Sequence, residues 1–546
     1  MRKKGLMLIS IFMLMGSFIL INQFQSKNFN AFNSVSLKKA EELKSVLENV
    51  KELNFTALLC NEVRVPFDEE SNTFFVPLDR ENDQWEKLEF ISGQPEYQIL
   101  FAEDVTNEDK QEMIAKGKKI PVLVYDSQHW AEYYVVFTGL PIIDLSTSQG
   151  YNSAEEISGN AVFFDVNFTR YGVITSEYNG HIRGNTSRMF PKKGYKINLR
   201  KTAADGVQEL NKISLFGMRK DDDWILQALY NDDTKIRDKF SMQVWESFGA
   251  ASVSNTGFYG PKTTYVEVFA DNQYCGLYAL TEPVDAKQMD LAEEDYSYKR
   301  KNPGSVKYMY EDFHAAEDPY DEVEGFELKE GPIGEGIDAW EPMASLAKVL
   351  TMSEETFLEQ ESQLINEKNA LNLWLFIQMI TGFDHIAKNV YYIARYDDDL
   401  EYDYQFCFAP WDMDLTWGNV SVGEINSVYT AFEKETFDKR VKWDVGDKLL
   451  ETNYHDARTY VQELYSSLRS TVLTDADIEE MISKLDDEVR NSGAFARDKM
   501  RWPESVFAYD YKELLDYAKT RLAFLDEILY DETYFEQDFN DRYDED

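Results

Sequence analysis

The stretch GFDHIAKNVYYIARYDDD (residues 382–399), followed by FAPWDMDLTWGN (residues 408–419), decides how this chain is interpreted. Asp384 stands five residues before Asn389, and the β-branched and aromatic residues after Asn389 predict a strand. The second segment adds Asp412 and Asp414 just after another predicted strand. The pattern predicts a β-hairpin surrounded by oxygen ligands, which indicates either a magnesium–nucleotide site or the ordinary loops of an acidic protein.

The composition of the chain limits its partners. Among its 546 residues 99 are acidic and 56 are basic, which gives a formal charge of −43. Nucleic-acid binding is excluded as an interpretation, because it needs a basic surface. An acidic surface attracts cations or basic proteins, or it serves only solubility. The length predicts two or three domains, and the three widely spaced cysteines match neither a zinc motif nor a disulfide framework.

The N-terminus carries the pattern of a targeting segment. Three basic residues, Arg2, Lys3 and Lys4, precede an apolar run at residues 5–21. This pattern is typical of a secretory signal peptide or a short membrane anchor, which we assign to residues 1–27. No Ala-x-Ala cleavage motif follows the run, which favours an uncleaved anchor. Because flanking positive charges stay in the cytoplasm, we expect a membrane-anchored or secreted protein whose bulk is extracytoplasmic.

The first half of the chain is predicted to be rich in strands. Residues 28–137 are expected to form a helix over residues 36–53 and then a small β-rich domain. Residues 138–291 continue with strands, which we expect to form a twisted antiparallel sheet with one helix packed on it. The clearest element is a hairpin at 263–282 that turns at Asp271-Asn272.

The second half of the chain is predicted to be mainly helical. The acidic and aromatic residues 292–337 are expected to form a long surface insertion. Residues 338–530 contain amphipathic helical patterns, among them an apolar helix at 367–383 that ends at Gly382, and residues 531–546 form an acidic tail. A β-rich lobe followed by a helical lobe, with the oxygen ligands just after a buried helix, predicts an α+β, two-lobed domain like that of a protein kinase.

Phosphoryl transfer needs few protein groups, and the two opening segments supply several of them. In kinases a catalytic aspartate precedes a metal-binding asparagine by five positions, and a second metal-binding aspartate lies on the next hairpin. On this pattern Asp384 is the candidate catalytic residue, and Asn389 with Asp412 or Asp414 are the candidate magnesium ligands. The chain departs from the pattern, because no His-Arg pair precedes Asp384 and WDMD replaces the Asp-Phe-Gly triplet.

The spacing by itself is weak evidence for a kinase. Asp-x4-Asn also occurs at Asp414–Asn419 and at Asp486–Asn491, and the second pair lies in an ordinary surface helix pattern. The surrounding order of buried helix, strand, acidic turn and strand strengthens the interpretation. Trp411 could make the turn rigid and offer an aromatic face to a purine ring.

The β-rich lobe offers candidate phosphate ligands. A glycine-flanked turn between two predicted strands contains Arg183 and Ser187, and Lys196 lies in the strand that follows. An inward lysine needs an anionic partner, such as Glu246, whereas an edge lysine points to solvent, and the pattern favours neither. Glu282 is expected in the connection between the lobes, where adenine would bind, or is an ordinary strand-end carboxylate.

Six segments, in order and at similar spacing, resemble the CotH (spore coat protein H) kinase-like family over residues 138–530. They are GLPIIDL, IRGNTSRMFPKKGYKINL, TKIRDKFSMQVWESFG, TYVEVFADNQYCGLYALTEPVD, GFDHIAKNVYYI and APWDMDLTWG. The resemblance implies an atypical protein kinase that uses ATP and magnesium to phosphorylate serine or threonine hydroxyls. In spore-coat members the substrates are basic, Ser-rich coat proteins, so the spore coat is one implied location.

The resemblance also implies roles for individual residues. By the matching motifs, Asp384 would be the catalytic aspartate, and Asn389 with an aspartate of WDMD would bind the metal. The motif keeps both aspartates, and Asp412 is the first choice. Arg183 and Lys196 would contact the phosphates of ATP.

Two other interpretations stay open. A membrane anchor would place the kinase domain where ATP is scarce, so the fold could serve a non-catalytic, kinase-like binding or structural protein of the cell surface or spore coat. Three metal ligands kept close together argue against this, since a scaffold has no need of them. Carbohydrate hydrolysis by paired carboxylates is a weaker alternative, because no pair of acids is singled out and the asparagine is left unexplained.

Overall fold

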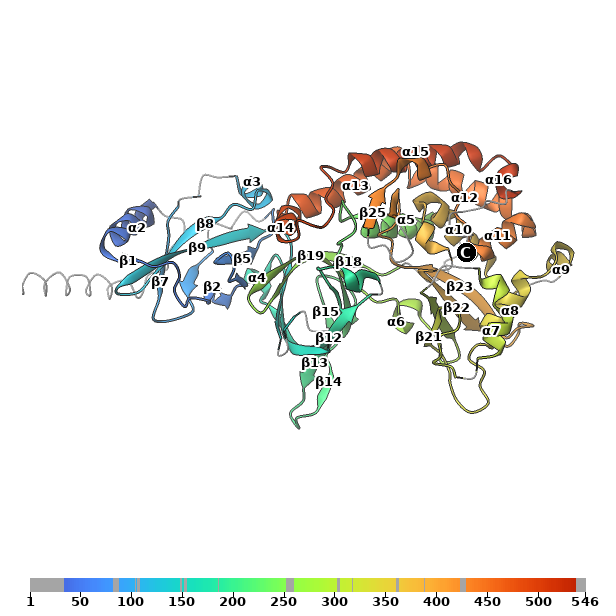
Figure 1. Cartoon of the computed structure of the whole chain (residues 1–546), viewed down its shortest axis with the longest axis horizontal. Helices are drawn as coiled ribbons and strands as arrows, with labels where there is room; N and C mark the ends of the chain where they lie inside the picture. Colours follow the sequence, from blue (N-terminus) through green and yellow to red (C-terminus); the bar gives the residue numbers. More distant parts are fainter. Residues whose placement is uncertain are drawn as a thin grey trace, which may run out of the picture.

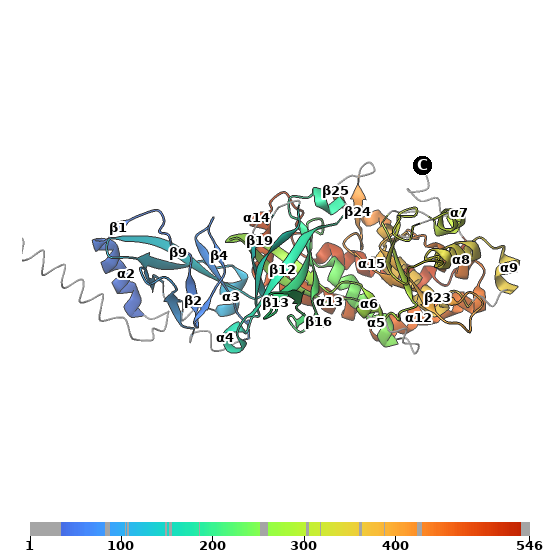
Figure 2. The ribbon, with the colours of Figure 1, turned by 90° about the horizontal axis from the view of Figure 1, so that it is seen from below.

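The chain folds into three parts in a row, an N-terminal β-rich domain, a β-barrel and a C-terminal helical lobe (Figure 1). The view turned by 90° shows the same order, so the molecule is elongated (Figure 2). The computed structural model describes residues 34–536, apart from 82–87, 104, 106–108, 148–149, 152–154, 185, 252–259, 302–304, 317, 360–362, 387 and 423–428.

The predicted signal or anchor at residues 1–27 lies outside the described residues, as does the acidic tail from residue 537 onward. Within the part of the chain that the structure describes, no helix is both long enough and apolar enough to cross a membrane. The anchor therefore stays a prediction from the sequence.

The N-terminal domain is built on a sheet with the strand order β4–β5–β9–β8–β7, and β1 pairs beside β9. A smaller sheet has the order β3–β2–β6. The elements are α2 (Ser34–Val46), β1 (Glu48–Asn49), β2 (Leu58–Cys60), β3 (Val63–Arg64), β4 (Phe67–Asp68), β5 (Thr73–Pro77), β6 (Phe90–Ser92), β7 (Gln98–Phe101), α3 (Lys110–Ala115), β8 (Ile120–Tyr125) and β9 (His129–Thr138). The predicted β-rich domain is thus present, with Phe67 stacked on Phe74 in its core at 4.5 Å between ring centres.

The first helix is shorter than the periodicity predicts. It ends at Val46, whose side chain is 75% exposed. Glu48 and Asn49 leave the helix to pair in parallel with His129 and Trp130 of β9. Backbone pairing with the sheet therefore overrides the helical spacing of the residues after Val46.

The sequence predicts a twisted antiparallel sheet in the middle part, and the structure shows that this sheet closes into a barrel with one parallel pair, β10 with β18. Its strand order is β12–β11–β10–β18–β19–β17–β13, and β13 pairs with β12 to close the ring. The elements are β10 (Ile142–Thr147), β11 (Ile157–Phe164), α4 (Phe168–Tyr171), β12 (Ile174–Arg183), a 3-10 helix (Thr186–Met189), β13 (Gly194–Thr202), β14 (Gln208–Leu210), β15 (Ile213–Ser214), β16 (Lys220–Asp221), β17 (Asp223–Gln227), α5 (Arg237–Ala251), β18 (Thr263–Ala270) and β19 (Gln273–Thr281). Large aromatic side chains such as Tyr178, Tyr195, Trp224 and Tyr278 fill its interior.

Two local predictions in this part are confirmed. β18 and β19 form the expected hairpin, and its two turn residues Asp271 and Asn272 have positive φ values of 50° and 59°, as a type I′ turn requires. The longest described helix of this part is α5, which shares one apolar core with the helices of the C-terminal lobe and with Tyr265 of β18. It therefore lies between the barrel and the helical lobe (Figure 1).

Residues 292–337 differ from the predicted surface insertion. β20 (Tyr296–Arg300) and β21 (Phe326–Glu330) extend the hairpin of β22 (Val390–Tyr396) and β23 (Tyr404–Pro410) into a four-stranded sheet of order β21–β20–β22–β23. Tyr298, Phe313 and Phe326 of this segment are buried in the core of the helical lobe. The aromatic residues of this segment are thus part of the hydrophobic core. The segment was predicted to be a loop because its many acidic residues are typical of one.

The helical lobe follows the predicted pattern. Its remaining elements are α6 (Ala286–Met289), a 3-10 helix (Val306–Tyr308), α7 (Tyr310–His314), α8 (Glu341–Leu350), α9 (Glu354–Glu359), α10 (Glu367–Ile380), a 3-10 helix (Phe383–His385), β24 (Asn419–Val422), β25 (Tyr429–Phe432), a 3-10 helix (Lys434–Thr436), α11 (Asp444–Glu451), a 3-10 helix (Tyr454–Asp456), α12 (Ala457–Thr471), α13 (Asp475–Arg490), α14 (Ala494–Arg501), α15 (Lys512–Ile528) and α16 (Thr533–Glu536). The Asn366 side chain caps α10 by accepting from Asn369 N–H. Most α10 side chains are buried, so the predicted buried helix is confirmed.

The chain returns from the helical lobe to the barrel through α14. Figure 1 shows this helix beside β19 and close to the N-terminal domain. Arg497 Nη2 lies 2.7 Å from Glu267 Oε2 of β18, and Lys192 Nζ lies 2.7 Å from Asp498 Oδ1. Both pairs are buried, so α14 is joined to the barrel through paired charges.

Candidate active site

Asp384 and Asn389 lie where the buried helix α10 gives way to the β22–β23 hairpin. Thr381 ends α10 in the left-handed conformation at φ 49°, and the 3-10 helix Phe383–His385 carries Asp384. The side-chain amide of Asn389 donates a hydrogen bond to Asp384 Oδ2 at 2.8 Å. The two residues of the kinase-like spacing are therefore in direct contact.

The hairpin brings the WDMD segment to this pair. Val390 of β22 pairs with Pro410 of β23, and one step further the Trp411 N–H donates to the Asn389 carbonyl oxygen at 2.9 Å. His385 Nε2 lies 3.1 Å from the Trp411 carbonyl oxygen, which can only accept, so this nitrogen carries the proton. Segments more than twenty residues apart in the sequence are thus fixed side by side.

Two residues of the candidate site, Asn389 and Asp412, have a left-handed backbone conformation. Their φ values are 56° and 64°. Asn and Asp tolerate this region better than most residues, and such conformations concentrate at functional sites. The turn also needs a glycine at position 382, because a Cβ there would lie only 2.9 Å from His385 Nδ1.

The charges of three carboxylates act on one ammonium group, that of Lys388. Lys388 Nζ lies 2.6 Å from Asp384 Oδ1. Burial lowers the pKa of Lys388, but the charges of Asp384, Asp412 and Asp414 outweigh this effect and raise it. Burial raises the pKa of Asp414 well above its usual value, and the charges of Asp412 and Asp384 raise it further. The three predicted acids therefore share one region in which negative charge is crowded.

Asp238 reaches the same region from helix α5. Its Oδ1 accepts a hydrogen bond from the Met413 N–H at 2.8 Å. The pKa of Asp238 is raised to about 7. Burial is the main cause and the charge of Asp412 raises the pKa further, while the hydrogen bond from Met413 opposes the increase. Sequence analysis missed both Asp238 and Lys388, since one acid in an amphipathic helix and one lysine beside an asparagine are common features.

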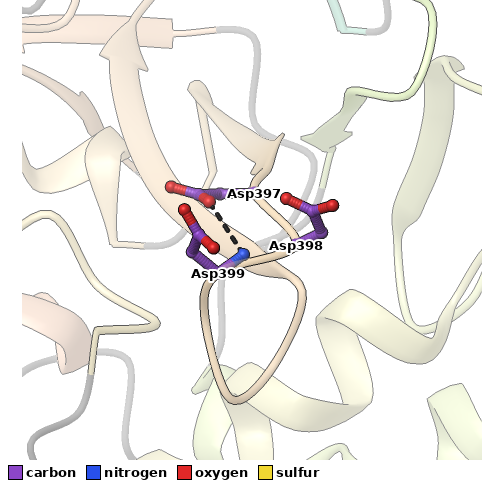
Figure 3. A group of neighbouring side chains, drawn as sticks. All are labelled: Asp397, Asp398 and Asp399. Atoms are coloured by element: carbon purple, nitrogen blue, oxygen red, sulfur yellow. Dashed lines mark hydrogen bonds between the residues drawn. The ribbon is translucent and has the colours of Figure 1, made fainter.

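A compact group of three carboxylates lies outside the candidate site. Among the described residues, only Asp397, Asp398 and Asp399 bring three carboxylate ligand atoms within 4.8 Å of one another (Figure 3). They form the exposed turn between β22 and β23, where the Asp399 N–H donates to Asp397 Oδ1 at 3.1 Å. Aspartates commonly stabilise turns in this way without any metal.

The predicted ligands form a more open set that nevertheless suits a hard cation. Asn389, Asp412 and Asp414 offer amide and carboxylate oxygens, and Mg²⁺ completes such a set with phosphate oxygens and water. Burial is the main reason that the pKa of Asp414 is raised, and a cation would relieve the like-charge repulsion that raises it further. The donors therefore fit magnesium, and their role as ligands stays a prediction.

Trp411 joins the barrel to the helical lobe. Its ring is 2% exposed and belongs to a small core with Ile225 of the barrel and Val284 of the connection between the lobes. The Arg183 guanidinium carbon lies 5.5 Å from the ring centre. A purine could stack on this indole only after the covering side chains moved, so the ring now serves as packing.

Ser187 lies in the 3-10 helix that follows Arg183, the last residue of β12. A Cβ on Gly184, whose φ is 104°, would meet Ser187 Oγ at 1.8 Å. The glycine therefore allows the hydroxyl to fold back over the turn, at the end of β12. A phosphate-binding role for Ser187 stays a prediction.

Lys196 points away from the barrel interior. Its neighbours Tyr195 and Ile197 face inward, and its Nζ lies 2.8 Å from Asp223 Oδ2. Burial raises the pKa of Glu246, and the charged groups that act on Glu246 are Lys262 and Glu282. The suggested Lys196–Glu246 pair is therefore wrong, because Lys196 stands on the outer face beside β17.

Glu282 holds backbone in place where the barrel meets the helical lobe. Its Oε1 accepts from the Arg219 N–H at 2.9 Å, and its Oε2 accepts from the Lys262 N–H at 3.2 Å. Both oxygens are thus occupied, and the residue is 3% exposed. It lies near the inter-lobe connection, as predicted, and a contact with adenine stays a prediction.

A cavity of about 360 Å³ opens in a different place, at the end of the β18–β19 hairpin. Tyr151, Cys275, Tyr278 and Trp502 are among the residues that line it. None of the predicted site residues belongs to its lining, so we assign it no part in the chemistry around Asp384.

Comparisons with known proteins give a matching protein family and matches among solved structures. A family described as "CotH kinase protein" matches residues 181–525. Among solved structures, the Helicobacter pylori proinflammatory kinase CtkA is similar at 10% sequence identity, over 53% of this chain and 95% of that chain, with a TM-score of 0.19. No curated protein matches this chain.

Proposed function

The chain belongs to the CotH kinase family, and we propose that it is a protein kinase that uses ATP and magnesium to phosphorylate serine or threonine hydroxyls. The observation that carries this proposal is the linked group of Asp384, Asn389 and the WDMD segment. Asn389 contacts Asp384 through its side chain and Trp411 through its carbonyl oxygen. One residue thus connects a candidate base to a candidate metal loop, as phosphoryl transfer requires.

Each polar group has a part in the proposed reaction. Asp384 would orient the attacking hydroxyl and accept its proton. Lys388, already 2.6 Å from Asp384, would move toward the transferred phosphoryl group and stabilise its negative charge. Asn389, Asp412 and Asp414 would hold magnesium, which would neutralise the negative charge of the phosphate groups of ATP. Arg183 would hold a phosphate from the barrel side.

The direct test is transfer of the ATP γ-phosphate by the purified full chain, to itself or to a basic, serine-rich test protein. Asp384→Asn should lower the rate at least about 100-fold, because the general base is lost while the shape is kept. Asp398→Asn is the matched control, since Asp398 is an exposed acid on the same hairpin. Transfer at the wild-type rate in Asp384→Asn would contradict the assignment.

A non-catalytic kinase-like protein of the cell surface or spore coat is the second candidate. It is favoured by the ion pair that occupies Asp384 and by the covered face of Trp411. A thermal-shift titration with magnesium-ATP separates the two proposals, because a ligand that binds only the folded chain stabilises it. Stabilisation that needs magnesium supports the kinase, and no shift at millimolar nucleotide supports the binding protein.

The substrate and the location follow from charge and from the N-terminus. With a formal charge of −43 the chain would attract a basic substrate, so a basic, Ser-rich protein is the proposed phosphoacceptor. The segment at residues 1–27 would attach the protein to a membrane or direct its secretion, with the spore coat as one location. Phosphopeptide mapping of a basic test protein and fractionation of cells producing the chain test these two proposals.

A further inference from the structure

Lys299 is a cation beside the candidate site that the kinase-like spacing does not include. It lies on β20, opposite Tyr391 of β22 and Glu327 of β21. Residues paired across antiparallel strands project to the same face of the sheet. Because Tyr391 packs with Ile225 of the barrel, this face of the sheet meets the barrel. β20 therefore directs Lys299 toward the junction of the two lobes.

Arg183 and Lys299 approach one indole ring from different lobes. The Arg183 guanidinium carbon and the Lys299 Nζ each lie 5.5 Å from the centre of the Trp411 ring. Neither side chain makes a hydrogen bond or an ion pair with a residue that the structure describes. The two cations are close enough for the charge of Arg183 to lower the pKa of Lys299.

Nearby cations, in contrast, have anionic partners. Lys388 pairs with Asp384 at 2.6 Å, Lys196 with Asp223 at 2.8 Å and Lys329 with Glu327 at 3.5 Å. These lysines are neutralised by the chain itself. Arg183 and Lys299 keep donors that are still available to a ligand.

The environment of Lys299 is unfavourable without an anion. Burial lowers its pKa to about 8, and Asp412 is the strongest charge that opposes this effect. Two like charges in a partly buried place cost free energy that an anion between them would remove. Phosphate is suited to this position, because guanidinium and ammonium groups both donate short, charge-assisted hydrogen bonds to its oxygens.

We propose that Lys299 of β20 and Arg183 of β12 form a two-sided clamp for the phosphate groups of a nucleotide, next to Asp412. The clamp rests on the proposed function, and it adds a phosphate ligand from the sheet of the helical lobe. Because one cation belongs to each lobe, a bound polyphosphate would tie the barrel to that sheet. Lys299 is then a binding residue that acts on the ligand and not on the hydroxyl acceptor.

The test measures binding of ATP, inorganic tripolyphosphate and adenosine to the full chain by calorimetry, with magnesium present. Lys299→Met should weaken ATP and tripolyphosphate about 10–100-fold, the range expected for one charge-assisted hydrogen bond, and leave adenosine unchanged. Lys299→Arg should keep most of the affinity. Lys329→Met is the matched control, because it removes a neighbouring lysine whose amine already pairs with Glu327.

The outcomes separate this inference from the proposed function. If wild-type chain binds ATP and Lys299→Met binds it equally well, the clamp is wrong and the kinase proposal is untouched. If wild-type chain binds tripolyphosphate but not ATP, and Lys299→Met loses this binding, the clamp stands without a kinase. The melting temperature of ligand-free Lys299→Met should equal or exceed that of the wild type. A lower value with normal tripolyphosphate affinity would assign Lys299 to packing alone and overturn the proposal.

Discussion

The Asp238 carboxylate accepts a hydrogen bond from the Met413 N–H at 2.8 Å, and this contact ties helix α5 to the WDMD loop. A second contact strengthens the tie, because Trp417 Nε1 donates to Ser241 Oγ of α5 at 2.9 Å. Helix α5 shares a core with both the barrel and the helical lobe. The position of the candidate metal loop therefore depends on a helix outside it.

We expect Asp238 to make stability depend on pH. Its folded-state pKa of about 7 lies above the ordinary value of 3.8. The folded chain then binds more protons than the unfolded chain between these values, so this residue lowers stability as pH rises from about 4 to 7. Asp238→Asn keeps an acceptor for Met413 and removes the charge. It should raise the free energy of unfolding at pH 8 by roughly 1–3 kcal/mol and leave it unchanged near pH 4.

Urea denaturation of Asp238→Asn and wild type across this pH range measures the effect. Asp398→Asn is the control, because its exposed carboxylate should give no pH-dependent difference. A constant difference between Asp238→Asn and wild type at all pH values would show that Asp238 ionises normally.

Removal of Lys388 should destabilise the site as well as slow transfer. Lys388→Met would leave Asp384, Asp412 and Asp414 without the ammonium group that they share. We expect a loss of roughly 1–3 kcal/mol, because a partly buried anion loses its partner. Phosphate transfer should fall about 10–100-fold. Thermal denaturation and steady-state kinetics measure the two effects.

A second lysine serves as the control, because it forms an ion pair of the same i,i+4 spacing outside the candidate site. Lys116 pairs with Glu112 at the same spacing, but both side chains of this pair are exposed. Lys116→Met should change stability by less than about 0.5 kcal/mol. Equal losses in the two variants would mean that Lys388 is only an ordinary surface charge.

The turn between β12 and β13 provides a test of local geometry. Gly184→Ala would add a Cβ 1.8 Å from Ser187 Oγ in a residue at φ 104°. The Ser187 hydroxyl must then move, so we expect lower affinity for magnesium-ATP together with a stability loss of roughly 1–3 kcal/mol. Gly206→Ala is the control for backbone strain, because Gly206 has φ 85° with nothing within 4 Å of its Cβ position. It should lose only about 1 kcal/mol and keep its affinity. Equal affinity in both variants would remove this turn from the site.

The sequence predicted elements whose signals are local. The Asp271-Asn272 turn between alternating residues identifies the β18–β19 hairpin, and the apolar run from Glu367 identifies α10. The contact between Asp384 and Asn389 is also nearly local, since five residues separate them. The kinase-like order then placed the WDMD segment close to them.

Features that depend on distant pairing could not be predicted. The barrel also needs β10 to pair in parallel with β18, as between Ile142 and Glu267, and no residue in either strand signals this distant partner. The acidic residues around β20 and β21 gave this segment the composition of a surface insertion, so the two strands were not predicted. Lys299 of β20 was therefore not recognised as a candidate site residue. The partner of Lys196 was also wrong, because strand alternation alone does not tell which side of a barrel strand faces the interior.

The last prediction concerns the junction of the three parts. Arg497 of α14 lies 2.7 Å from Glu267 of the barrel, and it also donates to Thr138 at the end of the N-terminal domain at 2.9 Å. The Tyr274 hydroxyl donates to Glu267 at 2.6 Å. Arg497→Met would leave Glu267 charged and buried, which costs about 3–5 kcal/mol for a broken buried pair. Thermal denaturation measures the loss.

The same substitution should loosen the N-terminal domain from the rest of the chain. Because Arg497 bridges Thr138 and Glu267, its loss should expose the short connection between β9 and β10, and proteolysis there should become faster. Arg501→Met is the matched control on the same helix, since Arg501 forms an exposed pair with Glu70 at 3.4 Å and should change stability by less than about 1 kcal/mol. A rate of cleavage unchanged in Arg497→Met would mean that apolar packing of Phe75 on Phe269, at 4.9 Å between ring centres, holds the domain without the ion pair.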